Sequence, residues 1–188
     1  MTRGAAVLVE RAEAKDIICR NHYSHSFPTG WTLCIGMEGA ICVWAIPANK
    51  NLAHFLFGGG IEIRELSRLW AMDGHSPNLL TQLIAGAVRA LRLACPKVEA
   101  CVSYADPNVG HEGFVYRAAS WLYTGQATES RYYQLPDGSP VARRAFHSGS
   151  HSRPPDLPVL YRPGKHRYVR CLSKRARKNL RVPIVNPA

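Results

Sequence analysis

The sequence lacks the features that would place the chain in a membrane or in an oxidising compartment. No apolar run approaches the roughly 18–20 residues that a membrane-spanning helix needs, and Glu10 and Glu13 interrupt the N-terminal region where a signal peptide would be apolar. The six cysteines are scattered without a CxxC pair, which favours reduced, buried thiols over disulfides or a zinc site. We therefore expect a cytoplasmic protein with no membrane partner.

Three motifs of nucleotide-binding and metal enzymes are also missing. The chain has no GxGxxG, no P-loop and no HExxH. The three successive glycines at positions 58–60 precede an expected strand and do not open a helix, so they fit a flexible turn and not a phosphate cradle.

Acidic residues are almost absent from the last quarter of the chain. Residues 1–142 hold 12 Lys/Arg and 12 Asp/Glu, whereas residues 143–188 hold 12 Lys/Arg and a single acid, Asp156. The net charge of +11 therefore lies entirely in that last segment. A solubilising tail would explain it, but cations interleaved with tyrosine and histidine favour a surface that follows nucleic-acid phosphates. The expected phosphate contacts are Lys165, Arg167, Arg170, Lys174, Arg175, Arg177 and Lys178.

What is present describes one globular domain of mixed α+β class. The chain has 188 residues and is 46% hydrophobic, enough to bury a core. Expected strands cover residues 5–9, 31–37, 40–46, 61–70, 98–104, 131–135 and 141–146. Expected helices cover residues 11–20, 77–91 (with Ser76 as N-cap) and 114–122. The strand–helix–strand unit over 61–104 requires one parallel pair inside an otherwise antiparallel sheet, with helices on both faces.

We expect the domain proper to cover residues 1–146. Residues 147–188 begin with a stretch rich in Ser, Pro and His that is typical of a linker, and continue as the basic segment. This C-terminal extension is either part of the same domain or an appendage to it.

Two polar clusters are candidates for chemistry. The first is Asn21-His22-Tyr23-Ser24-His25, at the end of the first helix. The second covers residues 103–113, directly after the central buried strand, where the carboxyl ends of parallel strands face a ligand crevice. Asp106 is its first acid, and an Asp-Pro turn is the simpler explanation. The concentration of Asp, Gly, His and Tyr around it favours function.

At this point the sequence resembles a known family. The pattern Tyr-Ala-Asp-Pro-x-x-Gly-His-x-Gly-x-x-Tyr-x-Ala-x-x-Trp-x-Tyr-x-Gly, from Tyr104 to Gly125, closely resembles the signature of the phage Mom family. Three further blocks are similar to that family's and occur in its order. They are His22-Tyr23-Ser24, Glu65-Leu66-Ser67-Arg68-Leu69 and Gly164-Lys165-His166-Arg167-Tyr168.

The resemblance implies a GNAT-like fold and an enzyme that converts the exocyclic N6 amine of adenine in double-stranded phage DNA to a carbamoylmethyl derivative. This modification shields the DNA from host restriction, and the enzyme would act in the cytoplasm of the host cell. By the same resemblance Asp106, Tyr116, His22 and Tyr23 are catalytic. Ser67 and Arg68 bind the cofactor, and His22, Tyr23 and Asp106 are an iron site, a chemically reasonable ligand set.

One departure affects the donor of the added group. GNAT enzymes bind the coenzyme A pyrophosphate on a glycine-rich turn at a helix N-terminus. Here residues 71–77 occupy that place, where Pro77 removes a donor and Asp73 adds a negative charge. Two donors stay open, an acyl-CoA and a glycyl-tRNA, which would make tRNA a partner. A homodimer is compatible with the sequence.

Two other functions also stay open. One is an acyl-CoA-dependent N-acetyltransferase of a protein or a small amine. The other is a non-enzymatic basic protein that coats DNA and blocks restriction passively.

Overall fold

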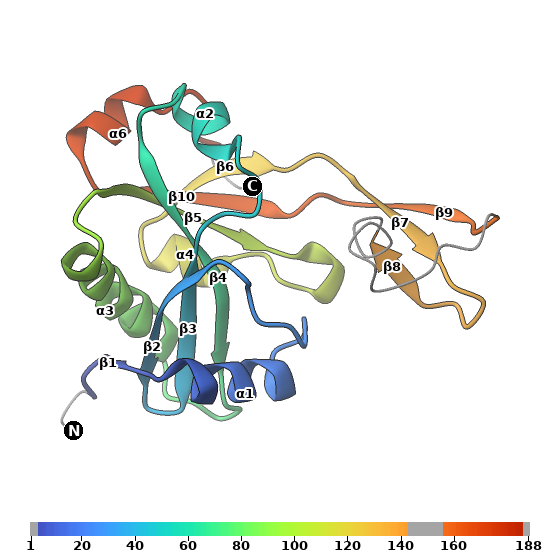
Figure 1. Cartoon of the computed structure of the whole chain (residues 1–188), viewed down its shortest axis with the longest axis horizontal. Coiled ribbons are helices and arrows are strands. Elements are labelled where there is room, and N and C mark those ends of the chain that lie inside the picture. The colour runs from blue at the N-terminus through green and yellow to red at the C-terminus, as the bar shows by residue number, and fades with distance from the viewer. Residues whose placement is uncertain (1–3, 143–155, 186–188) are drawn as a thin grey trace.

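The computed structural model describes residues 4–142 and 156–185, which form a large and a small β-sheet with helices around the large one (Figure 1). The seven-stranded sheet has the order β1-β2-β3-β4-β5-β10-β6, and the three-stranded sheet the order β8-β7-β9. The strands of the large sheet are β1 (Val7–Leu8), β2 (Trp31–Met37), β3 (Ala40–Ala45), β4 (Glu62–Ala71), β5 (Val98–Ala105), β10 (His166–Cys171) and β6 (Leu122–Gln126). Those of the small sheet are β7 (Ser130–Gln134), β8 (Pro140–Ala142) and β9 (Val159–Arg162).

The expected parallel pair is present as β4 and β5. Their register runs from Glu62↔Val98 to Leu66↔Ser103, while every other described pair is antiparallel. The crossover between the two strands is α3 (Leu79–Ala94). Its apolar residues recur every three to four positions, so one stripe of the helix is buried against the sheet. The fold class predicted from the sequence is confirmed in this respect.

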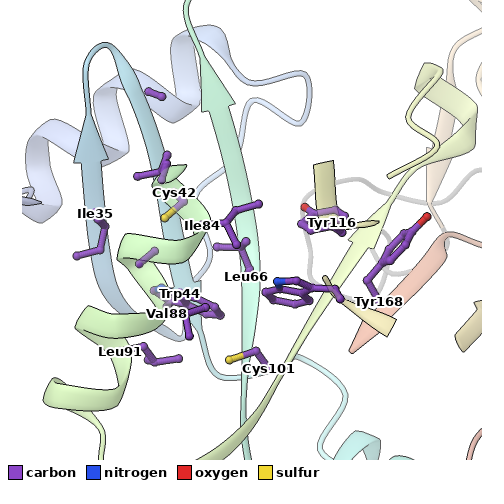
Figure 2. Close-up of a cluster of buried hydrophobic side chains, with 14 of the residues drawn as sticks. Ile35, Cys42, Trp44, Leu66, Ile84, Val88, Leu91, Cys101, Tyr116 and Tyr168 are labelled. Carbon is purple, nitrogen blue, oxygen red and sulfur yellow. The ribbon is translucent and has the colours of Figure 1, made fainter. Parts of the chain in front are cut away.

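Helices cover both faces of the large sheet. On one face, α3 and α4 (Phe114–Ala118) pack over a core that includes Trp44, Leu66 and Tyr116 (Figure 2). The opposite face is covered by α1 (Arg11–Asn21), α2 (Leu52–Phe57) and α6 (Lys174–Asn179). Burying each large apolar side chain contributes about 1.5–3 kcal/mol, so these two layers hold the sheet in place.

Three local predictions differ from the structure. Residues 52–57, for which neither a helix nor a strand was expected, form α2. The long helix begins at Leu79 and not at Pro77, because Asn78 adopts a left-handed conformation with φ 64°. The helix expected over 114–122 ends at Ala118, because Ser120 has φ 61°, and the chain continues as β6.

The basic C-terminal segment contains a central element of the fold. Strand β10 lies between β5 and β6 and is hydrogen-bonded to both. This part of the chain therefore belongs to the same domain as residues 4–142. The boundary predicted at 146/147, and the part of the strand predicted over 143–146, lie outside the described residues.

Two further predictions concern the thiols and the membrane. All six cysteines are free thiols, but only Cys34, Cys42 and Cys101 are buried as expected, while Cys19, Cys95 and Cys171 are partly exposed. Within the residues that the structure describes, no helix combines the length and the apolar character needed to span a bilayer.

Candidate active site

A pocket of about 480 Å³ lies where β4 and β5 diverge. The pairing of the two strands ends at Leu66↔Ser103, whereas β4 continues to Ala71. Ser67 is the extra residue of a β-bulge, because β3 pairs with Leu66 and with Arg68 and skips it. The last residues of β4 therefore have no β5 partner, and their free edge forms a wall of the pocket.

The walls come from both faces of the sheet. Tyr116 and Leu80 line the pocket from the face of α3 and α4, and His22 and Tyr23 line it from the end of α1 on the other face. The loop between β5 and α4 contributes residues 110–113. A pocket that passes between two diverging strands can receive one reactant from each face.

His22 is a buried, neutral donor in this pocket. Its side chain is only 6% exposed, and its Nδ1 accepts a hydrogen bond from the Ser24 backbone N–H at 3.1 Å. The proton of the neutral ring is therefore on Nε2. Burial, followed by the positive charges of Arg68 and Lys165, lowers the pKa of His22 to about 4.

The Tyr23 ring, 40% exposed, covers the His22 ring at a centroid distance of 4.3 Å. It also meets His111 edge-on at 5.1 Å. The two tyrosine contacts connect the end of α1 with the loop after β5, the two clusters singled out in the sequence. The structure therefore brings both clusters to one pocket.

Asp106 lies beside the pocket as the partner of Lys165. Its Oδ2 is 3.0 Å from Lys165 Nζ, and its Oδ1 accepts hydrogen bonds from the backbone N–H and the side-chain amide of Asn108. Burial alone would raise the pKa of Asp106, but Lys165 and Asn108 outweigh it and hold the pKa below its usual value. A carboxylate stabilised in this way is a weak base, and its contacts with Asn108 and Lys165 fix the loop.

The arrangement does not suit the predicted iron site. Both oxygens of Asp106 are occupied, and a metal there would compete with the Lys165 ammonium. Iron binding by His22, Tyr23 and Asp106 stays a prediction from the resemblance, and we derive no step through it.

Ser67 and Arg68, expected to bind a cofactor, take different positions. Ser67 lines the pocket. The guanidinium of Arg68 donates to the Ser26 carbonyl at 2.8 Å and the Ser26 hydroxyl at 3.0 Å, and also to Ser67. Arg68 thereby ties the loop after α1 to β4 and holds that wall of the pocket.

Tyr116 is a buried part of the pocket wall. Its ring is 6% exposed and lies at 5.2 Å from the Tyr168 ring. Burial raises its pKa above the usual tyrosine range, opposed by a hydrogen bond with Ser103. Ser103 in turn donates its own proton to the Leu66 carbonyl at 2.8 Å. Tyr116 therefore stays protonated near neutral pH.

The loop over Tyr168 requires a glycine. The Tyr168 hydroxyl donates to the Glu112 carbonyl at 2.6 Å, and Gly113 follows with φ 75°. A Cβ at Gly113 would collide with the Tyr168 ring. Glu112 also pairs with His166 at 3.1 Å, so the pocket loop is fastened to β10 at two points.

The seven cations expected to bind phosphate differ in their exposure and in their contacts within the protein. Arg167 is 8% exposed, donates to Thr124 and stacks over Phe55 at 5.0 Å, so its assignment as a phosphate contact is revised to a structural one. Arg170 donates to the Ala119 carbonyl, and Arg175 binds Glu99 and Gly60. The exposed ones on α6 are Lys174, Arg175, Arg177 and Lys178.

Sequence reasoning missed several residues that line the pocket. His111 and Glu112 lay inside the predicted 103–113 cluster but received no role of their own. Trp70 and His75 also line the pocket, and nothing in their local sequence pointed to it. The position of Trp70 depends on the bulge at Ser67, which no pattern in β4 revealed.

The family model of the Mom protein family matches residues 6–186. A curated relative, "Methylcarbamoylase mom" of Escherichia phage Mu, is 30% identical over 186 residues, covering 91% of this chain and 76% of that protein. A crystal structure of Arabidopsis thaliana NAA60 in complex with acetyl-CoA has a TM-score of 0.51 at 7% identity and covers 89% of this chain and 99% of that one. This last likeness concerns the fold alone, and it confirms the expected GNAT-like architecture.

Proposed function

Because the chain belongs to the Mom protein family, we propose that it is a transferase that converts adenine N6 in double-stranded DNA to its carbamoylmethyl derivative. The modified DNA would then resist restriction endonucleases. The observation that carries the proposal is the pocket between β4 and β5, which is lined from both faces of the sheet. The relative from phage Mu is named a methylcarbamoylase, in agreement with a group of this kind.

The pocket suits a base taken out of the duplex. A base must leave the stack before its exocyclic amine can react, and aromatic side chains commonly receive it. Tyr23, Trp70 and Tyr116 all line the pocket, and its volume falls within the roughly 300–1,000 Å³ of small-molecule sites. The donor would enter from the opposite face of the sheet, so that the two reactants meet at the free edge of β4.

His22 is the side chain best placed to polarise the donor. Its Nδ1 is held by the Ser24 N–H, which leaves an N–H at Nε2. A neutral imidazole N–H can donate to a carbonyl oxygen as negative charge develops there. Since the N6 lone pair is delocalised into the purine, such activation of the electrophile matters more than a strong base. Asp106 then acts through the loop and Lys165 and does not take the N6 proton itself.

For the donor we propose a glycyl-tRNA. Transfer of the glycyl group to N6 gives purine–NH–CO–CH₂–NH₂ and frees the tRNA hydroxyl, which takes up one N6 proton. The new amine then attacks C6 through a five-membered spiro ring, an intramolecular step with a high effective molarity. Cleavage of the original C6–N6 bond, with one proton passing from the attacking amine to the departing nitrogen, yields purine–NH–CH₂–CO–NH₂, the carbamoylmethyl product. No oxidant or reductant is needed.

The position of Asp73 supports this choice over coenzyme A. Asp73 lines the pocket in front of α3, where a diphosphate would meet its negative charge. Pro77 precedes the helix without an N–H, and the Leu79 N–H is already bonded to the Ser76 carbonyl. The N-terminus of α3 therefore offers a diphosphate fewer donors than a glycine-rich turn does.

Isotope labelling tests the donor chemistry. DNA whose adenine N6 is nitrogen-15 should give product with the label in the terminal amide. Label that remains on the nitrogen attached to the purine would contradict the rearrangement and indicate direct alkylation, while the proposed product would stand.

Mass spectrometry of nucleosides tests the function itself. DNA from cells that express the protein should contain deoxyadenosine heavier by one carbamoylmethyl group, and DNA from cells that express His22→Ala should not. Unmodified DNA that still resists restriction would instead identify a protein that coats DNA. Saturable micromolar binding of coenzyme A, with an acetylated amine as product, would identify an N-acetyltransferase.

A further inference from the structure

The small sheet extends from the pocket end of the large one. Strand β6 leads into β7, and β9 leads into β10, whose first residue His166 pairs with Ala105 at the carboxyl end of β5. Figure 1 shows β7, β8 and β9 projecting away from the body of the molecule. We call these three strands the arm.

The base of the arm is fastened to the loop that borders the pocket. Lys165 forms the ion pair with Asp106, and the Asn108 side-chain amide donates to the Pro163 carbonyl at 3.2 Å. The Ala127 N–H donates to the Lys165 carbonyl at 2.9 Å. A side chain at Gly164 would collide with the Ala127 carbonyl. These contacts set the direction of the arm relative to the pocket.

Both faces of the arm present a cation stacked on a ring. The Arg131 guanidinium lies 5.3 Å from the centroid of the Tyr133 ring, and the Arg162 guanidinium lies 5.2 Å from that of Tyr132. Arg131 is opposite Tyr161 in the register, so they share one face, while Arg162 lies on the other. Tyr161 is 67% exposed. Stacking orients the guanidinium groups and leaves their N–H donors for phosphate.

The cations of α6 lie at the other end of the sheet. Ser173, the N-cap of α6, donates to Glu99 beside the first residue of β5. From there to Ala105 at the pocket end β5 spans about 20 Å, at about 3.3 Å per residue. The base of the arm is therefore nearer to the pocket than α6 is, by about the length of β5.

We propose that the arm is the surface that grips duplex DNA beside the pocket. Arg131 and Arg162 contact phosphates, and Tyr161 packs against the sugars or base edges between them. A cation on each face matches the two phosphate strands that border a groove. The inference rests on the proposed function and adds to it the surface that holds the substrate.

Fluorescence anisotropy with a labelled duplex, at a series of salt concentrations, tests the assignment. The double variant Arg131→Ala/Arg162→Ala should bind more weakly, and its slope of log K against log salt should be shallower by about 1.8, since each lost phosphate contact removes about 0.9. The matched control is Lys174→Ala/Lys178→Ala, which removes two exposed cations from α6 and should leave the slope within about 0.5. Arg131→Lys/Arg162→Lys keeps both charges and should keep the slope.

Tyr161 gives a second, charge-independent measurement. Tyr161→Ala should weaken duplex binding several-fold without changing the salt slope, and Tyr161→Phe should bind like the wild type. Equal losses in the arm and α6 variants would overturn the assignment. So would an arm variant that loses only tRNA binding.

Modification of the same duplex separates this proposal from the proposed function. A wild type that modifies adenine while the arm variants bind normally would overturn the role of the arm and leave the enzyme. A wild type that binds through the arm but modifies nothing would overturn the reaction and leave the surface.

Discussion

At the scale of single residues, the site combines a histidine kept neutral with a carboxylate kept charged. His22 is buried among cations, whereas Asp106 is bound by a lysine and an amide. Burial lowers the pKa of His22, and Lys165 and Asn108 lower the pKa of Asp106. Neither group therefore changes its protonation state near neutral pH. Each has a consequence that can be measured separately.

The titration of His22 should be displaced far into the acid range. We expect its ring proton resonances to titrate with a midpoint of about 4, whereas an exposed histidine titrates near 6.5. Because the folded pKa is lower than the unfolded one, the unfolded state binds its proton first. Stability should therefore decline as the pH falls from about 6.5 towards 4. NMR titration with His22→Gln for assignment measures this, and a midpoint above 6 would contradict the buried position.

Asp106→Asn should cost stability in a pH-dependent way. The folded pKa of Asp106 is lowered, so its contribution is present above the unfolded value of about 3.9 and is lost as the pH falls through the folded value. We expect the variant to be less stable by about 1–3 kcal/mol at pH 7. This difference should shrink below pH 3, as measured by urea unfolding.

The same variant distinguishes a positioning residue from a general base. A general base contributes about 10²- to 10⁴-fold to a rate, and we expect Asp106→Asn to lose less than that when assayed at a temperature where it is folded. A larger loss of rate in a folded variant would show that Asp106 is the general base.

At the scale of elements, the loop between β5 and α4 is shaped by its glycines. Gly110 and Gly113 both have positive φ, 77° and 75°. They differ in their surroundings, since a Cβ at Gly110 would meet nothing within 4 Å, whereas a Cβ at Gly113 would strike the Tyr168 ring. This difference makes the two positions a matched pair.

Gly113→Ala should destabilise the protein more than Gly110→Ala. A left-handed conformation costs a non-glycine residue about 1–2 kcal/mol, which is the whole expected effect at Gly110. Gly113→Ala adds a collision in a packed core, so we expect about 3 kcal/mol or more. Thermal unfolding of both variants gives the comparison, and equal losses would mean that Tyr168 moves aside freely.

Elements with a clear periodicity of apolar residues were predictable from the sequence. Elements that depend on contacts with residues distant in the sequence were not. The stripe of α3 and the hairpin of β2 and β3 follow from local patterns. Strand β10 contains Arg167 and Arg170, and its successive residues from Arg167 to Val169 are all buried, so no alternation of apolar and polar residues marks it as a strand. Arg167 is accommodated because Thr124 and the Phe55 ring receive its guanidinium.

The candidate site followed the same rule. His22, Tyr23 and the loop after β5 could be named from clusters and from the family signature. The wall formed by β4 could not, because it depends on the bulge at Ser67 and on the end of pairing at Leu66. The lysine partner of Asp106 is also distant in sequence, so the low basicity of that carboxylate was not visible.

At the scale of the whole molecule, the basic C-terminal segment has structural and electrostatic roles that sequence composition cannot separate. After α6 the chain returns across the sheet, where Arg181 donates its N–H to the Leu56 carbonyl and Val185 donates to the Tyr123 carbonyl. Leu180 and Val182 pack against the core under α2. The segment therefore closes one face of the fold.

Removing residues 165–188 should therefore unfold the protein and not merely weaken its DNA binding. The deletion takes out β10 from between β5 and β6, and with it the buried Tyr168 and Val169. It also leaves β6 without its partner in the large sheet and turns β5 into an exposed edge strand. Circular dichroism and thermal unfolding of the truncated chain should show no cooperative transition. The charge-only variant Lys174→Gln/Lys178→Gln should melt like the wild type, because both side chains are exposed on α6. A truncated chain that still unfolds cooperatively near the wild-type temperature would mean that the segment is an appendage. The large sheet would then form without β10.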